Sequence, residues 1–287
     1  MTADLDTGLR DYLVTNRDFM APAVEQAIGL LDLNAARRVL DVGTGGGGAL
    51  PVLARATGPD GLVVGVDRHP GVIALAARHA ERAGVRARTN LVAADVDDVL
   101  TEAAALGGSF DAIWAGDVVW PGNFTDPGAL VRRFVPALAP GGVVALFTSN
   151  YYQAMVLPGR SALERKLRTA SELRWGLPQD GPHHHERHVS WLLDAGLRDV
   201  ALRVVPRVGF PLDADPAVRP YLEHAVLPEL LASARSHGEQ AGLSPAELRR
   251  AEELLDPAGP SCVLDEPGYY VVQPALLVTG RAAPYAR

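Results

Sequence analysis

A glycine-rich turn near the start of the chain holds the residues whose chemistry is easiest to interpret. An apolar run interrupted only by Asp41 covers residues 39–42, and five of the six residues 43–48 are glycine. Residues 49–54 then have the composition of a helix. A strand, a glycine turn and a helix in this order present free backbone N–H groups and the positive end of a helix to a ligand. Glycine is required because a Cβ atom would block the tight turn and the approach of that ligand. The stretch therefore predicts a site for a nucleotide-like cofactor.

The glycines fit two patterns that belong to different cofactors. Gly43, Gly45 and Gly48 satisfy G-x-G-x-x-G, the dinucleotide fingerprint. Asp41 with Gly43, Gly45 and Gly47 satisfies D-x-G-x-G-x-G, which resembles motif I of the class I S-adenosylmethionine-dependent methyltransferases. A carboxylate repels the pyrophosphate of a dinucleotide, whereas S-adenosylmethionine carries an ammonium and a sulfonium and no phosphate. Asp41 therefore favours the second pattern.

Two more acids follow apolar runs. Asp67 ends the run 61–67 and lies 24 residues after Gly43 (67 − 43), a spacing at which a carboxylate accepts hydrogen bonds from ribose hydroxyls. Both patterns expect such an acid. Asp95 lies in Ala-Ala-Asp-Val, which resembles the methyltransferase motif. The resemblance implies that this carboxylate accepts from the adenine amino group and that the next backbone N–H, that of Val96, reaches the ring.

Three further motifs resemble the same family. They are F-D-A-I at 110–113, L-x-P-G-G at 138–142 and W-L-x-x-A-G at 191–196. The resemblance covers residues 35–150 firmly and 184–281 loosely. It implies an α/β fold with a Rossmann-like, doubly wound, seven-stranded sheet, strand 7 antiparallel, and helical lid insertions.

The chain is long enough for one large α/β core with lids. The expected parts are 1–34, N-terminal lid helices with an interruption at Pro22; 35–150, the S-adenosylmethionine-binding core; 151–183, a lid insertion; 184–210, a continuation of the core; 211–260, a helical lid insertion; and 261–287, the final core strand. Pro274 lies inside that last strand, so a bulge is expected there. Leading helices often close over the cofactor in this family, which makes Tyr12, Asn16 and Arg17 candidate lid contacts.

The candidate site residues fall into three groups. The expected cofactor-binding residues are Asp41, Gly43, Thr44, Gly45, Gly47, Asp67, Arg68, Asp95, Val96 and Ala115. The expected substrate-binding residues are the aromatic side chains of Trp120, Tyr151, Tyr152 and Trp175. Aromatic walls suit a flat or apolar acceptor and stabilise a sulfonium by cation–π contact. Trp114 belongs to the same aromatic set but also fits a buried strand.

Asp117, His185 and His188 are the candidate catalytic residues. Asp117 follows the fourth strand, where ligands bind in open α/β sheets, and imidazole titrates near neutral pH. Alignment of the reactants supplies most of the acceleration of a methyl transfer, so a base is needed only if the acceptor must first lose a proton. The run His183–His185 is interpreted as a histidine-rich helix start and not as a metal site, because three consecutive side chains cannot all point inward.

Composition restricts the partners. The formal charge is −7 without a basic run, which argues against a nucleic-acid partner. One cysteine, Cys262, excludes an internal disulfide and a thiolate zinc site. The chain has neither a signal-peptide layout at its start nor an apolar stretch of the ~20 residues that cross a bilayer, so a cytoplasmic protein without membrane contact is expected. The expected partner is a small-molecule acceptor, and the expected assembly is a monomer or homodimer.

The expected reaction is S-adenosylmethionine-dependent methyl transfer to O, N or C of a small aromatic or apolar acceptor, as in secondary metabolism, with S-adenosylhomocysteine as product. Two alternatives stay open. One is an NAD(P)-dependent Rossmann oxidoreductase, although no Tyr-x-x-x-Lys is present, since Ala162 lies four residues before Lys166. The other is the same fold binding the cofactor for a non-methylating reaction such as a cyclisation.

Overall fold

The computed structural model describes residues 6–106, 108–211 and 215–284. Within these ranges seven strands form one mixed sheet in the order β3-β2-β1-β4-β5-β7-β6. The strands are β1 (Arg38–Val42), β2 (Leu62–Asp67), β3 (Thr89–Ala93), β4 (Phe110–Gly116), β5 (Leu138–Thr148), β6 (Arg198–Gly209) and β7 (Val271–Arg281). The first five are parallel, and β7 runs antiparallel to both β5 and β6. The expected fold class and the reversed last strand are confirmed.

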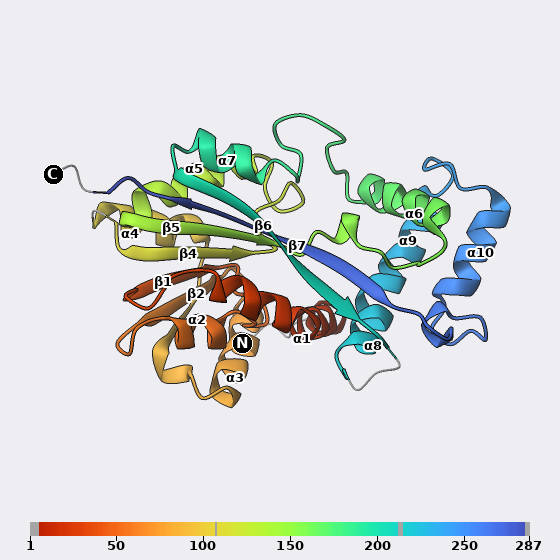
Figure 1. Cartoon of the computed structure of the whole chain (residues 1–287), viewed down its shortest axis with the longest axis horizontal. Helices are drawn as coiled ribbons and strands as arrows, with labels where there is room; N and C mark the ends of the chain where they lie inside the picture. Colours follow the sequence, from red (N-terminus) through yellow and green to blue (C-terminus); the bar gives the residue numbers. More distant parts are fainter. Residues whose placement is uncertain (1–5, 107, 212–214, 285–287) are drawn as a thin grey trace.

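Helices cover both faces of the sheet (Figure 1). One face packs against α1 (Thr7–Gly29), α2 (Leu50–Ala56) and α3 (Pro70–Arg82) through residues such as Val39 and Val63. The other packs against α4 (Val96–Ala105), α5 (Pro127–Ala137) and α7 (His188–Asp194) through their neighbours Leu40 and Val64. Successive side chains of a strand point to opposite faces, so strands buried on both faces are apolar along their whole length.

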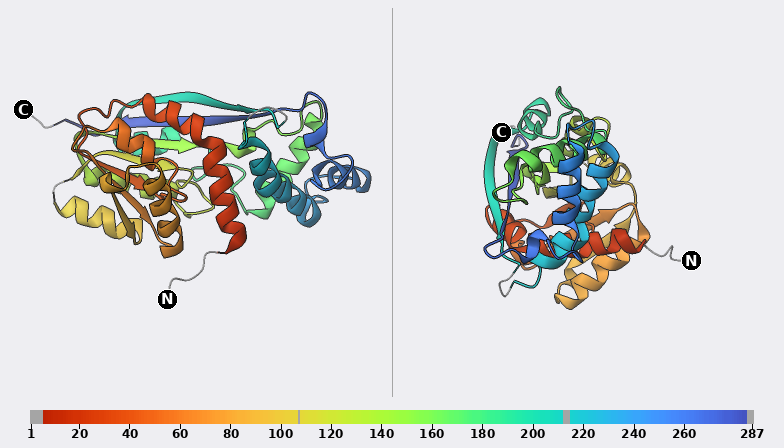
Figure 2. Two further views of the ribbon diagram at one scale, coloured as in Figure 1. Left: turned by 90° about the horizontal axis from the view of Figure 1, so that it is seen from below. Right: turned by 90° about the vertical axis from the view of Figure 1, so that its right-hand side faces the viewer.

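A third group of helices lies beyond the carboxyl ends of β4 and β5 (Figures 1 and 2). It consists of α6 (Ser161–Arg174), α8 (Val218–Tyr221), the π-helical turn η3 (Leu222–Val226), α9 (Leu227–His237) and α10 (Pro245–Leu255). The two insertions expected as lids pack together here, because Glu229 of α9 accepts from Ser171 Oγ and Trp175 Nε1 at 3.1 and 2.9 Å. These helices and the strand ends enclose the region where a ligand is expected.

The first helix continues through Pro22, so the expected interruption is wrong. Its buried residues lie on both sides of the proline and include Phe19 and Ile28. The Phe19 ring stacks on Tyr221 with centroids 4.2 Å apart, and the Arg207 guanidinium lies 4.6 Å from the centroid of the same Phe19 ring. Arg207 Nε also donates to the Phe19 carbonyl at 2.6 Å. These contacts outweigh the hydrogen bond that a proline removes from a helix interior.

The bulge expected at Pro274 is also wrong. Pro274 pairs with Pro206, and the register of β6 with β7 is continuous there; the shift lies between Arg198 and Ala201. The β5 ladder reaches only to Leu276, so at Pro274 the strand β7 has β6 as its one ladder partner. The N–H that Pro274 lacks would point to the side of β7 where β5 no longer pairs, so no hydrogen bond between strands is lost. A strand tolerates proline at such a position.

Candidate functional site

The glycine turn follows β1 at the carboxyl edge of the sheet. Gly43, Gly45 and Gly47 have φ values of 61°, 51° and 79°, a left-handed conformation that L-residues with a Cβ atom adopt only at a cost. Gly48 is not among the residues with positive φ. The conformation therefore follows D-x-G-x-G-x-G and not the dinucleotide spacing.

The space around Gly47 and Gly48 distinguishes the two glycine motifs in the same way. A Cβ on Gly47 would lie 3.0 Å from the Cα atom of Ala76 in α3, which is backbone and cannot move aside. A Cβ on Gly48 would meet Cγ of Arg17 at 2.9 Å, part of a side chain that can shift. Gly47 is therefore required by the fold of the turn, whereas Gly48 is required only by the present position of Arg17.

Asp41 lies beneath this turn and is 2 % exposed. Its Oδ2 accepts from Thr44 Oγ1 at 2.6 Å. Burial raises the pKa of its carboxyl group to about 7; the Thr44 hydrogen bond lowers it, and the charge of Asp67 raises it further. A carboxyl group that is half ionised near neutral pH responds strongly to a nearby cation.

The pairing of the strands brings Asp67 and Ala115, two further expected cofactor residues, to the same carboxyl edge of the sheet. Val42 pairs with Val66 on one side and Ala115 on the other, and Asp67 pairs with Ala93. Asp67 accepts from His69 N at 3.0 Å and from Gly45 N at 3.4 Å, so it contacts the glycine turn directly.

Four expected cofactor residues have less direct positions. Asp95 is exposed and caps α4, accepting from Asp97 N at 2.9 Å, with Val96 as the first helical residue. Arg68 is exposed, and Ala115 is 1 % exposed within the core on the α4–α5–α7 face.

The ends of β4 and β5 form the next wall of the site. Asp117 and Asn150 have φ values of 54° and 44°, which is a strained conformation for residues other than glycine. Asp117 Oδ1 accepts from Ser149 N at 2.6 Å, which joins the two strand ends. The next residue, Val118, would lie 2.7 Å from a Cβ on Gly43 and so closes over the glycine turn. Burial raises the pKa of Asp117.

His188 and His185 lie beside these strand ends. His188 is 2 % exposed, and its Nε2 is 3.0 Å from Thr148 Oγ1 at the end of β5. Burial lowers the pKa of His188 to about 4 and also lowers the pKa of His185, which favours the neutral form of both rings. The helix α7 begins at His188, so His183–His185 precede it in turns and do not form its first turn.

The expected substrate aromatics gather in two pairs. Trp120 lies 5.8 Å from Trp175, and Tyr151 lies 5.2 Å from Tyr152, between ring centroids. The Tyr152 ring is in turn 5.3 Å from His185. Trp114 is 2 % exposed and stacks on Phe147 at 5.3 Å, so it is a core residue.

The first half of α1 covers the glycine turn. A Cβ on Gly46 would lie 3.0 Å from the Leu13 carbonyl, and Arg17 donates to the Gly46 carbonyl at 3.3 Å while pairing with Asp18 at 2.7 Å. Leu13 and Val118 are contacts of the turn that sequence reasoning missed. An apolar residue at helical spacing beside Tyr12 and Arg17 was the available signal for Leu13; Val118 had none.

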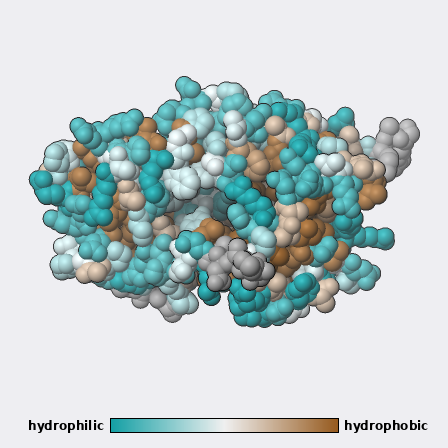
Figure 3. Space-filling model, turned by 180° about the vertical axis from the view of Figure 1, so that it is seen from behind, coloured by the Kyte–Doolittle hydropathy of each residue, from teal (hydrophilic) through white to brown (hydrophobic). Residues whose placement is uncertain are grey.

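Tyr12 lies one residue before Leu13 on α1 and is 44 % exposed. Burial, and then the charges of Asp117 and Glu229, raise the pKa of its hydroxyl. The back of the molecule is hollowed near its middle (Figure 3).

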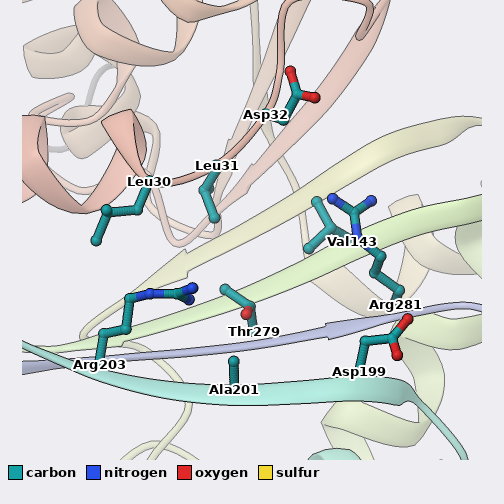
Figure 4. Close-up of a pocket in the computed structure, with 9 residues that line it drawn as sticks. All are labelled: Leu30, Leu31, Asp32, Val143, Asp199, Ala201, Arg203, Thr279 and Arg281. Atoms are coloured by element: carbon teal, nitrogen blue, oxygen red, sulfur yellow. The ribbon is translucent and has the colours of Figure 1, made fainter.

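Two pockets lie elsewhere on the molecule. One, of about 190 Å³, lies at the opposite end of β5, with Arg203, Arg281 and Asp199 on the sheet and Asp32 after α1 (Figure 4). The other, of about 290 Å³, lies between residues 153–159 and α6. Neither contains an expected cofactor residue. Among the helices described, none is long and apolar enough to span a membrane.

Comparison with known proteins agrees with this geometry. A methyltransferase-domain family profile matches residues 33–176. An aklanonic acid methyltransferase of Streptomyces sp. strain C5 is 31 % identical over 161 residues, covering 55 % of this chain and 68 % of that protein. A ubiquinone biosynthesis O-methyltransferase of Azorhizobium caulinodans is 35 % identical over 142 residues, but the match spans only about half of each protein, 50 % of this chain and 49 % of that one.

A solved structure has the same fold over nearly the whole chain. It is a methyltransferase of Thiobacillus denitrificans in complex with S-adenosylhomocysteine, with a TM-score of 0.52 at 14 % identity, covering 97 % of this chain and all of that one. The chain belongs to the class I S-adenosylmethionine-dependent methyltransferases. The oxidoreductase alternative is therefore wrong.

Proposed function

We propose that the protein transfers the methyl group of S-adenosylmethionine to a small, largely apolar organic acceptor held outside the carboxyl ends of β4 and β5. The observation that supports this most is the glycine turn, with left-handed Gly43, Gly45 and Gly47 between the carboxyl groups of Asp41 and Asp67. When bound, the cofactor supplies a sulfonium methyl group that is already activated toward a nucleophile.

The residues around the turn have complementary roles in this proposal. The glycines let the ligand approach the backbone, Asp67 accepts from the ribose hydroxyls, and Asp95 with the Val96 N–H selects adenine. Asp41 and the Thr44 hydroxyl it binds supply negative charge for the ammonium group. Arg68 and Ala115 complete the wall of the cofactor site.

Alignment and exclusion of water are the remaining tasks of this chain. Leu13 and Arg17 of α1 cover the turn from one side. In this proposal Trp120, Tyr151, Tyr152 and Trp175 form walls for the acceptor. Reaction geometry of this kind accounts for most of the acceleration when the electrophile is activated. Asp117, His185 and His188 lie at the strand ends where a proton of the acceptor would have to be removed.

Methyl transfer itself is tested by incubating the protein with a donor labelled in its methyl group and with fractionated metabolite extracts. We expect label in a small organic product and stoichiometric S-adenosylhomocysteine. Conversion of an acceptor without release of S-adenosylhomocysteine would support the non-methylating alternative instead.

A further inference from the structure

A buried histidine beside the proposed acceptor site has both ring nitrogens without hydrogen-bond partners among the described residues. His185 is 6 % exposed, and neither Nδ1 nor Nε2 has a partner within the described ranges. The neighbouring His188 is 2 % exposed and is already engaged, with Nε2 3.0 Å from Thr148 Oγ1 and the ring in contact with the Val119 backbone. A buried polar atom without a partner costs about 1–3 kcal/mol, so a group that lacks one in the free protein is poised to gain one from a ligand.

A continuous series of contacts leads from the glycine turn to His185. Val118 closes over Gly43, Asp117 is bonded to Ser149, and Thr148 is bonded to His188. The His185 ring lies 5.3 Å from that of Tyr152, in the short turn that follows β5. His185 therefore lies beyond the end of β5, on the proposed acceptor side of the cofactor site.

The surroundings of His185 are aromatic and carry little unbalanced charge. Its ring stacks on His184 at 4.3 Å and lies 5.3 Å from that of Tyr152. Arg168, whose charge acts on neighbouring Tyr151, is paired with Glu164 at 2.7 Å. Glu186 is exposed and accepts from the uncharged Gln153 amide at 3.1 Å, and its charge acts on His185. An anionic ligand would therefore meet a carboxylate and no free cation among these groups.

The segment that carries His185 is able to admit a ligand. Residues 182–187 contain no helix or strand, and a side-chain hydrogen bond, that between Gln153 and Glu186, joins them to the turn after β5. Trp191 Nε1 donates to the Pro182 carbonyl at 2.9 Å and anchors the start of the segment. A ligand would be admitted by a shift of residues 184–187, which contain no helix or strand that would have to break.

We propose that His185 is the residue that recognises the acceptor, by a hydrogen bond to an uncharged hydroxyl or carbonyl oxygen on an aromatic ring. A neutral imidazole offers one donor and one acceptor, which matches a hydroxyl group, and Tyr152 supplies the flat apolar surface for the ring. This inference rests on the proposed function, since it concerns the acceptor half of the same site.

Three matched probes test the inference on the full-length protein saturated with S-adenosylhomocysteine. They are 1-naphthol, which has the hydroxyl group, naphthalene, which lacks it, and 1-naphthalenesulfonate, which replaces it with a fixed charge. Binding is measured by calorimetry or by probe fluorescence. We expect 1-naphthol to bind about tenfold more tightly than naphthalene, the effect of one buried hydrogen bond, and the sulfonate to bind more weakly than 1-naphthol.

Substitutions assign that preference to His185. His185→Leu should abolish the difference between 1-naphthol and naphthalene, whereas His185→Gln, which keeps a donor and an acceptor, should retain most of it. His224→Leu, at an exposed histidine of η3, is the control and should change nothing. If His185→Leu fails to fold, nitrogen NMR of the histidine side chains in the unaltered protein gives the same information, because 1-naphthol should move the His185 signals.

The outcomes separate the two proposals. Failure of S-adenosylhomocysteine to bind would refute the proposed function. Binding of S-adenosylhomocysteine with no binding of 1-naphthol, tighter binding of the sulfonate, or a hydroxyl preference that survives His185→Leu would each refute only the recognition role of His185.

Discussion

Asp41 is the residue at which stability and ligand binding conflict. Its carboxyl group is buried, with a pKa of about 7 in the folded protein against an ordinary value of 3.8. Between these values the folded state holds a proton that the unfolded state has lost, so stability falls as pH rises through this window. The negative charge that would attract the ammonium group of the cofactor therefore opposes folding of the free protein.

For Asp41→Asn we expect a higher melting temperature than the unaltered protein at about pH 8, and an advantage that disappears toward about pH 4. The amide keeps an oxygen for the Thr44 hydroxyl and has no charge to bury. The same substitution should weaken S-adenosylhomocysteine binding at about pH 8. Thermal melts across this pH range and calorimetric titration check both effects, with the exposed Asp98→Asn as control. A variant that is less stable at high pH would contradict the burial argument.

Asp67→Ala should weaken S-adenosylhomocysteine binding by roughly 1.5–3 kcal/mol, the range for hydrogen bonds to charged groups. Because Asp67 is only partly buried and contacts the turn through backbone N–H groups, the fold should remain intact. Calorimetric titration measures the loss, and circular dichroism checks the fold. Unchanged affinity would mean that the ribose is held by other groups.

The conformation of the strand–turn–helix unit depends most on one glycine, Gly47. Gly47→Ala should destabilise the protein by about 1–2 kcal/mol from the left-handed conformation alone, with a further cost from contact with Ala76. Gly48→Ala should cost much less, because Arg17 can move. Melting curves and S-adenosylhomocysteine titrations of the pair check this order. If Gly48→Ala destabilised the protein more than Gly47→Ala, the turn would follow the dinucleotide spacing instead.

Sequence reasoning located the parallel core well because that core depends on local signals. Apolar runs ending in Asp41, Asp67 and the F-D-A-I motif predict strands at 38–42, 62–67 and 110–116 with errors of one or two residues. Each of these features depends on residues close together in the chain.

Contacts between distant segments were not predictable in this way. The continuity of α1 through Pro22 depends on Phe19 packing between Tyr221 and Arg207, about 200 residues further along the chain. Likewise, the straight ladder at Pro274 depends on where β5 ends. The site residues Val118 and Leu13 were missed for the same reason, since their roles come from packing against the glycine turn. The assignment of the expected site residues to the cofactor or to the acceptor stays a prediction.

Cofactor choice is a property of the whole molecule. A saturating ligand that binds only the folded state stabilises it, by about 2.7 kcal/mol at a hundred times its dissociation constant. For a chain of this size S-adenosylhomocysteine should raise the melting temperature by roughly 5–10 °C, whereas NAD and NADP should not change it. Differential scanning fluorimetry with the three compounds is sufficient. A shift with NAD alone would contradict the cofactor assignment.

The proline pair in the last two strands has a consequence for self-association. Neither Pro206 nor Pro274 has an N–H, so they can face each other only as a non-hydrogen-bonded pair, and the backbone of Pro206 then points to the open edge of β6. Leu202, Val204 and Val208 alternate with Pro206 along the same strand, and all three are exposed. Such an edge would otherwise be a template for another strand.

Pro206 removes a donor from the middle of this edge, which protects the protein against fibril-like stacking of copies through β6. Pro206→Ala should leave the melting temperature almost unchanged and increase aggregation on concentration or mild heating. Light scattering and thioflavin fluorescence would detect it, and Pro274→Ala, which restores an N–H away from the open edge, should not have this effect.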